Sequence, residues 1–206
     1  QFKSNGVKLG YVAQESHEIV DVTYCPVLNE VNQLHLEELR RSLPNSDWRT
    51  SKNRQWTTID IDDERGTPLV NQRQAFRQGN SEQNEQLRVW LRSRLAHLSR
   101  PDAVFELFCG SGNLTEVIAE KVDVPIIAIE GDETSLEALS ARNLSNVQPV
   151  WVNLFSQHSI VDNMPESQPG IGVVLDPPRD GLKEREALKP WFTGAEWVVY
   201  VSCDLR

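Results

Sequence analysis

Two rhythms of apolar and polar positions run along the 206 residues. From about residue 103 onward, five short apolar runs, AVFELF, PIIAIE, PVWVN, GVVLD and WVVYVS, alternate with segments of helical spacing. Those helical segments are LTEVIAEKV, SLEALSARNL and EREALKPWF. Apolar strands that alternate with helices are typical of a mostly parallel sheet covered on both faces. The pattern predicts an α/β domain whose ligands bind beyond the carboxyl ends of the strands.

The first third of the chain is organised differently. Residues 7–24 predict two short strands joined by the polar QESH, and the spacing of apolar residues predicts a helix within 25–43. The polar stretch from Pro44 to Arg73 predicts a linker that contains one strand, QWTTIDI, and a capped helix is expected from Ser81. We therefore expect two domains, a partial α+β domain with its linker at 1–73 and a ligand-binding α/β domain at 74–206.

Composition narrows the class of protein. The formal net charge is −9, which argues against a basic surface over the whole chain, although LRRSL, DWRTSKNRQW and NQRQAFRQ concentrate Arg and Lys. Three widely separated cysteines, Cys25, Cys109 and Cys203, give no disulfide framework and fit a reducing compartment. No apolar run reaches the length of a membrane span, and no leader is visible. We expect a cytoplasmic protein without a membrane partner.

A glycine-containing loop follows the first strand of the α/β part, in FELFCGSGNLT. Gly110 and Gly112 allow a sharp turn and close approach of a ligand to the backbone, and the next helix offers free N–H groups. An ordinary strand-to-helix turn is the alternative. The third glycine of a dinucleotide fingerprint would fall at Thr115, which disfavours a nicotinamide or flavin cofactor.

Three further strand ends carry chemistry. Glu130 ends the second strand, where a carboxylate suits the two ribose hydroxyls of an adenosine cofactor. Asp176 is followed by two prolines, which hold its carboxylate at the sheet edge. Cys203 comes just after the last apolar run, where a nucleophile is favoured over a core residue. Solvent-facing or structural roles remain the alternatives for each.

The ordered motifs FCGSGN, IEGD, LDPPRDGL and YVSCD resemble those of the RNA uridine-5-methyltransferases, over most of residues 75–206. Upstream, QAFRQGNSEQN is similar to that family's Phe-x-Gln-x-Asn segment, and the sequence around Cys25 resembles the segment that supplies one iron–sulfur ligand in the ribosomal-RNA branch. The resemblance implies a Rossmann-like class I methyltransferase domain preceded by a smaller α+β segment. It also implies an RNA partner, ribosomal RNA more than transfer RNA, and a monomer.

Residue by residue, the resemblance implies a set of roles. Cys203 matches the catalytic nucleophile, Cys25 matches a single ligand of a 4Fe-4S cluster whose other ligands are absent from these residues, and Cys109 falls to packing. Implied contacts to S-adenosylmethionine come from Gln78, Phe108, Gly110, Gly112, Asn113, Glu130, Asn153 and Asp176.

The chemistry of uridine methylation accounts for these residue types. Thiolate addition at carbon 6 of uracil makes carbon 5 nucleophilic toward the methyl sulfonium, and a base must then remove the carbon 5 proton. The family's proton-abstracting glutamate lies well beyond its cysteine, and Asp204 stands where the family has Asn. We therefore expect these residues to be a fragment, truncated at its C-terminus and inactive alone.

Two other classes stay open at this point. An amino-methyltransferase could use the Asp176-Pro-Pro motif to hold an exocyclic amine, and Cys203 would then be dispensable. A non-catalytic RNA-binding module that keeps the fold would bind no cofactor. A transfer-RNA uridine-5-methyltransferase is the alternative within the family, because DPPR occurs in both branches.

Overall fold

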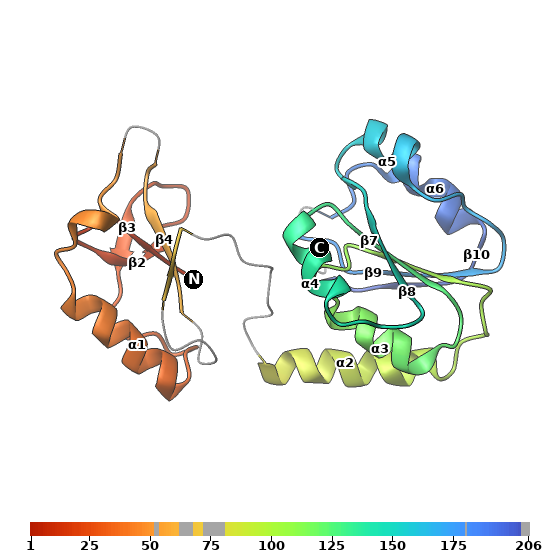
Figure 1. Cartoon of the computed structure of the whole chain (residues 1–206), viewed down its shortest axis with the longest axis horizontal. Coiled ribbons are helices and arrows are strands. Elements are labelled where there is room, and N and C mark those ends of the chain that lie inside the picture. Colours follow the sequence, from red (N-terminus) through yellow and green to blue (C-terminus); the bar gives the residue numbers. More distant parts are fainter. Residues whose placement is uncertain (52–53, 62–67, 72–80, 180, 203–206) are drawn as a thin grey trace. The chain divides into compact units, whose positions relative to one another are not determined.

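The computed structural model describes residues 1–51, 54–61, 68–71, 81–179 and 181–202. The chain divides into two compact units, Gln1–Arg73 and Gln74–Arg206 (Figure 1). Each unit has its own sheet and its own core. None of the helices among these described residues is long and apolar enough to span a membrane.

The first unit is built on a five-stranded sheet of order β3-β2-β1-β4-β5, whose neighbouring strands are antiparallel. Strands β2 and β3 form the hairpin expected within 7–24, and α1 lies within the helix expected in 25–43. Phe2, Leu36 and Ile59 form the centre of its core, each fully buried. The elements are β1 (Phe2–Ser4), β2 (Leu9–Val12), β3 (Ile19–Asp21), α1 (Glu30–Arg41), the 3-10 helix η1 (Ser46–Trp48), β4 (Thr57–Asp60) and β5 (Leu69–Val70).

The prediction of a linker from Pro44 to Arg73 was only partly right. Strand β4 was expected, but it pairs with β1 in the middle of the sheet, and β5 extends the sheet beyond it. Trp48 is buried in the same core. The polar sequence concealed this because β4 buries only alternate residues, Thr57 and Ile59, and a threonine does not stand out as a core residue.

The second unit is a doubly wound α/β layer. Its elements are α2 (Ser81–Leu95), β6 (Val104–Leu107), α3 (Asn113–Lys121), β7 (Ile126–Glu130), α4 (Glu133–Ser140), β8 (Val147–Trp151), α5 (Gln157–Asn163), β9 (Ile171–Leu175), α6 (Arg185–Thr193) and β10 (Ala195–Tyr200). All strands are parallel in the order β10-β9-β6-β7-β8, which is the Rossmann-like arrangement expected from the sequence.

Alternate residues of the central strand face two different cores. Val104 packs with residues of α2 and α3, whereas Phe105 and Leu107 pack with residues of α5 and α6. Figure 1 shows these two pairs of helices on opposite faces of the sheet. The chain leaves β6 toward β7 on one side and reaches β9 on the other, so the topological switch point lies between β6 and β9. A ligand is expected beyond the carboxyl ends of the strands at that point.

Helix α5 was not predicted. Its sequence offers only Ile160 and Val161 as a short apolar pair, and Val161 is exposed. A start signal was present, because the side chain of Ser156 accepts a hydrogen bond from the Ser159 amide at the N-cap.

Candidate functional site

The glycine loop between β6 and α3 has two glycines with different surroundings. Both adopt positive φ, +54° at Gly110 and +92° at Gly112. A methyl group on Gly112 would come within 2.5 Å of Leu139 Cδ1, so this glycine allows the loop to pack on α4. A methyl group on Gly110 would meet no described atom within 4 Å. Gly110 therefore faces open space at the sheet edge, where a ligand can approach the backbone.

The Glu130 carboxylate ties the glycine loop to the end of β7. Its Oε2 accepts a hydrogen bond from the Gly110 amide at 3.0 Å, and its Oε1 accepts from the amides of Gly131 at 2.7 Å and Asp132 at 3.0 Å. A carboxylate has about four acceptor sites. Three are therefore used to fix Glu130 across two loops, and it keeps capacity for one further donor.

Phe108 stands at the end of β6 with a positive φ of +63°, a strained conformation for an aromatic residue. Such strain persists only where the surroundings enforce it, and it is concentrated at functional sites. The ring of Phe108 packs against that of Phe155, which follows β8, with centroids 5.7 Å apart. The ends of β6 and β8 are therefore joined by an aromatic pair at the same edge.

Asn153 and Asp176 occupy the ends of β8 and β9. The exposed Asn153 accepts a hydrogen bond from the Phe155 backbone N–H through its side-chain Oδ1, at 3.0 Å. The backbone N–H of Asn153 donates to Ser159 Oγ at 2.9 Å. Asp176 is partly buried, and burial raises the pKa of its carboxyl. Its amide donates to the Leu107 carbonyl at 3.4 Å, so it lies beside the end of β6.

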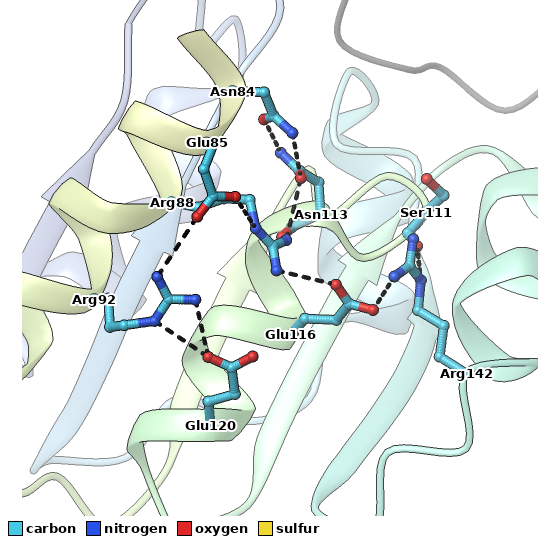
Figure 2. Close-up of polar contacts among 9 residues, drawn as sticks. All are labelled: Asn84, Glu85, Arg88, Arg92, Ser111, Asn113, Glu116, Glu120 and Arg142. Carbon is cyan, nitrogen blue, oxygen red and sulfur yellow. Dashed lines mark hydrogen bonds and ion pairs between the residues drawn. The ribbon is translucent and has the colours of Figure 1, made fainter. Parts of the chain in front are cut away.

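Asn113, an expected cofactor contact, is turned toward α2. Its side-chain amide forms a reciprocal pair with that of Asn84, with distances of 2.7 and 3.0 Å (Figure 2). The guanidinium of Arg88 donates to the Asn113 carbonyl and to Oδ1. Asn84 and Arg88 take both acceptor positions of its Oδ1, whereas one N–H of its Nδ2 is used by neither of these described residues.

The same polar network holds the glycine loop from two sides. Glu116 of α3 accepts from Arg88 of α2 at 3.2 Å and from Arg142, which follows α4 (Figure 2). Arg142 also donates to the Ser111 carbonyl of the loop at 2.7 Å. Sequence reasoning missed this network, although Arg88 and Arg92 lie on one face of α2 at a spacing that faces Glu116 and Glu120.

Glu106, in the middle of β6, is a second residue that sequence reasoning missed. It is 2% exposed, and its Oε2 has no hydrogen-bond partner among the described residues. Burial raises the pKa of Glu106 to about 8; the nearby Thr115 hydroxyl opposes the rise and Asp176 adds to it. The signal was a single charge in the apolar run AVFELF.

The two cysteines of the described chain are buried. Cys109 packs with Ala128 and Leu139, and burial, with Glu106 and Glu130 nearby, strongly raises the pKa of its thiol. Cys25 is 5% exposed, and its Sγ lies 3.2 Å from the Tyr11 hydroxyl. Within the described ranges, no group of three or more His, Cys, Asp or Glu side chains could hold a metal. The predicted contact Gln78 and the predicted nucleophile Cys203 lie outside the described residues.

A separate hollow of about 490 Å³ lies away from this edge. It is lined by Ser167, Gln168, Pro169, Glu186, Lys189, Pro190, Thr193 and Gly194. Residues 167–169 precede β9 and Gly194 precedes β10, so the hollow is at the amino ends of these parallel strands. Gly110, Glu130, Asn153 and Asp176 follow or end strands at their carboxyl ends, which form the opposite edge of the sheet.

The chain is similar to several curated proteins. An uncharacterized RNA methyltransferase, NE1857 of Nitrosomonas europaea, is 39% identical over 99% of this chain and 52% of its own length. The 23S rRNA (uracil(1939)-C(5))-methyltransferase RlmD of Acinetobacter baumannii is 34% identical over 63% of this chain and 28% of its own. An uncharacterized RNA methyltransferase of Brucella melitensis, BMEI1496, is 29% identical over 97% of this chain and 58% of its own. No protein-family model matches.

The chain thus spans 52% of the length of the Nitrosomonas protein and 28% of the length of RlmD. The motifs at the strand ends led to the expectation of a relationship with RNA methyltransferases, and the relatives confirm it. Homologues of this chain are named RNA methyltransferases, and they include the 23S rRNA uracil-C5 methyltransferase RlmD.

Proposed function

We propose that this chain carries the donor-binding edge and the nucleophile of an RNA methyltransferase, which transfers a methyl group from S-adenosylmethionine to carbon 5 of a uridine. Ribosomal RNA is the proposed substrate, in preference to transfer RNA, because relatives named for 23S rRNA are among the matches. The observation that carries the proposal is the pairing of the Glu130 carboxylate with the Gly110 amide beside the switch point of a parallel sheet.

The described residues fit an adenosine-containing donor. Glu130 is fixed by three amides and keeps one acceptor site, which suits a ribose hydroxyl. Gly110 leaves room above the loop, and Phe108 and Asn153 place an aromatic ring and an amide at the ends of β6 and β8, on either side of β7. When bound, the donor supplies an electrophilic methyl group on a sulfonium. The residues of the chain bind it and hold it at this edge.

Cys203 is the proposed nucleophile. Its thiolate would form a bond to carbon 6 of uracil, and carbon 5 would then take the methyl group as the bond between methyl and sulfur breaks. Removal of the carbon 5 proton by a base would expel the thiolate and release 5-methyluridine. Cys109 cannot take this role, since burial raises the pKa of its thiol and a nucleophile must be a thiolate. The target base would be flipped out of its stack to reach the site.

A 4Fe-4S cluster does not fit the described residues. Cys25 is one possible ligand, and its Sγ is buried against Tyr11. The described part of the chain holds no group of ligands that would complete a cluster. The sequence prediction places the other ligands of such a cluster outside these residues, so Cys25 stays a predicted single ligand.

The test is the identity of the product. The whole protein should transfer a labelled methyl group from S-adenosylmethionine to uridine-containing RNA, and digestion should release the label as 5-methyluridine. Cys203→Ala should abolish transfer without weakening the binding of S-adenosylhomocysteine. Cys109→Ala, at a cysteine that packs in the core, is the matched control that should retain transfer. A labelled exocyclic amine, with activity kept in Cys203→Ala, would instead identify an amino-methyltransferase. A folded protein that binds RNA but neither S-adenosylmethionine nor S-adenosylhomocysteine would be a non-catalytic module.

A further inference from the structure

The buried acid of β6 lies on the same face of the sheet as the acid at the end of β9. In the parallel pairing of these strands, Glu106 is opposite Val174 and Leu107 is opposite Leu175. Asp176 is therefore diagonal to Glu106, two residues further along, and side chains two residues apart point to the same face. Val104 and Val174 show which face this is, because both pack toward α2 and α3.

Glu106 and its neighbours form a polar cluster beneath the glycine loop. Glu106 is 2% exposed and Thr115 of α3 is fully buried, and neither Glu106 Oε2 nor Thr115 Oγ1 has a hydrogen-bond partner among the described residues. Neighbouring acids add to these pKa shifts: Asp176 raises the pKa of Glu106, and Glu106 and Glu130 raise the pKa of Cys109. The arginines that contact α3 are engaged elsewhere, Arg88 by Asn113 and Glu116, Arg142 by Glu116 and Arg92 by Glu120.

The negative charge of Asp176 raises the pKa of the buried Glu106 carboxyl, so ionising both acids costs more than ionising Asp176 alone. Burial raises the pKa of both Glu106 and Asp176, and no cation contributes to either shift among the described residues. A positive charge that binds at the sheet edge favours ionisation of the pair. An uncharged ligand of the same shape gives no such benefit.

We infer that Glu106 and Asp176 form a carboxyl pair beneath the glycine loop that makes this edge select the cationic methyl donor over its neutral thioether product. The inference rests on the proposed function, because S-adenosylmethionine carries a sulfonium and S-adenosylhomocysteine does not. Glu106 has the role of a specificity-determining residue that acts at a distance, and the pair releases a proton when the sulfonium binds. Product release is favoured by the same device, since the sulfonium charge disappears when the methyl group leaves.

The test is the number of protons released on binding. Calorimetry of the whole protein at pH 7, in two buffers of different ionisation enthalpy, gives this number for S-adenosylmethionine and for S-adenosylhomocysteine. An acid with a pKa of about 8 is about 90% protonated at pH 7. A positive charge within about 4–6 Å lowers the pKa of a carboxyl by about 1–3 units. The donor should therefore release about 0.4 of a proton or more in excess of the product. Glu106→Gln should still bind the product and should lose at least half of this excess.

Each outcome decides between the inference and its alternatives. Equal proton release by the two ligands in the wild-type chain overturns the inference, and so does an unchanged excess in Glu106→Gln. If the folded whole protein binds neither ligand, the proposed function is contradicted instead. If Glu106→Gln fails to fold, the wild-type chain is titrated with 5′-methylthioadenosine and its S-methyl sulfonium, which lack the titrating amino acid part. A proton release common to both of these probes also overturns the inference.

Discussion

An alanine at Gly112 should destabilise the α/β unit far more than an alanine at Gly110. Both glycines have positive φ, which costs an alanine about 1–2 kcal/mol. Only at Gly112 would the added methyl group meet a buried side chain, Leu139, at 2.5 Å. Leu139 is 2% exposed and packs with Cys109 and Ala128, so it cannot move aside freely. Overpacking adds about 1–3 kcal/mol, which gives about 2–5 kcal/mol in total for Gly112→Ala.

Gly110→Ala should separate stability from binding. The loss of stability should stay near 1–2 kcal/mol, because no described atom lies within 4 Å of the added methyl group. The same methyl group would occupy the open side of the loop, so affinity for S-adenosylhomocysteine should fall more than about tenfold. Urea unfolding and calorimetry measure the two effects. Equal destabilisation by both alanines would refute the packing argument, and unchanged affinity in Gly110→Ala would refute the placement of the ligand.

Three further predictions follow from particular contacts. Glu106→Gln should gain stability relative to wild type by about 1 kcal/mol per pH unit between pH 5 and 8. In the wild type the folded state keeps the Glu106 proton, whereas the unfolded state loses it above the ordinary pKa of a glutamate, so the wild type loses stability as the pH rises. A difference in urea midpoint between variant and wild type that is the same at pH 5.5 and at pH 8 would contradict this. Arg88→Ala should cost about 1.5–3 kcal/mol and Arg92→Ala only about 0–1 kcal/mol, because Arg88 is 15% exposed and Arg92 is 31% exposed; thermal unfolding at low and high salt checks the order. Gly172→Ala should prevent stable folding because its methyl group would come within 2.2 Å of the Trp197 indole. Gly194→Ala should fold, because no described atom outside the adjoining residues would lie nearer than 3.6 Å to its methyl group. Circular dichroism would show whether each variant is folded.

Much of the α/β unit could be predicted because its signals are local. Each of the five apolar runs became a strand of the parallel sheet. The signal is strongest for β6 and β9, because a strand buried on both faces needs apolar residues at nearly every position. The strand ends then placed Gly110, Glu130 and Asp176 at one edge by topology alone. This follows because parallel strands end on the same side of a sheet.

What could not be predicted depends on contacts between distant residues. The Asn84–Asn113 pair joins residues 29 positions apart, and no periodicity identifies which surface amide on α2 will face α3. Glu106 was overlooked because a single acid in an apolar run gives no indication of its depth until the packing of α3 is known. The sheet role of β4 likewise depends on its pairing with β1, more than fifty residues away.

The central claim is that Cys203 attacks uracil next to a donor bound at the glycine-loop edge. The most direct measurement uses the whole protein with S-adenosylmethionine and RNA in which uridine is replaced by 5-fluorouridine. Because fluorine cannot leave as a proton, the thiolate stays attached after methyl transfer. The account predicts a stable protein–RNA adduct that requires the donor and maps to Cys203 by mass spectrometry. Methylation of ordinary RNA without any such adduct, or an adduct at another residue, would contradict it.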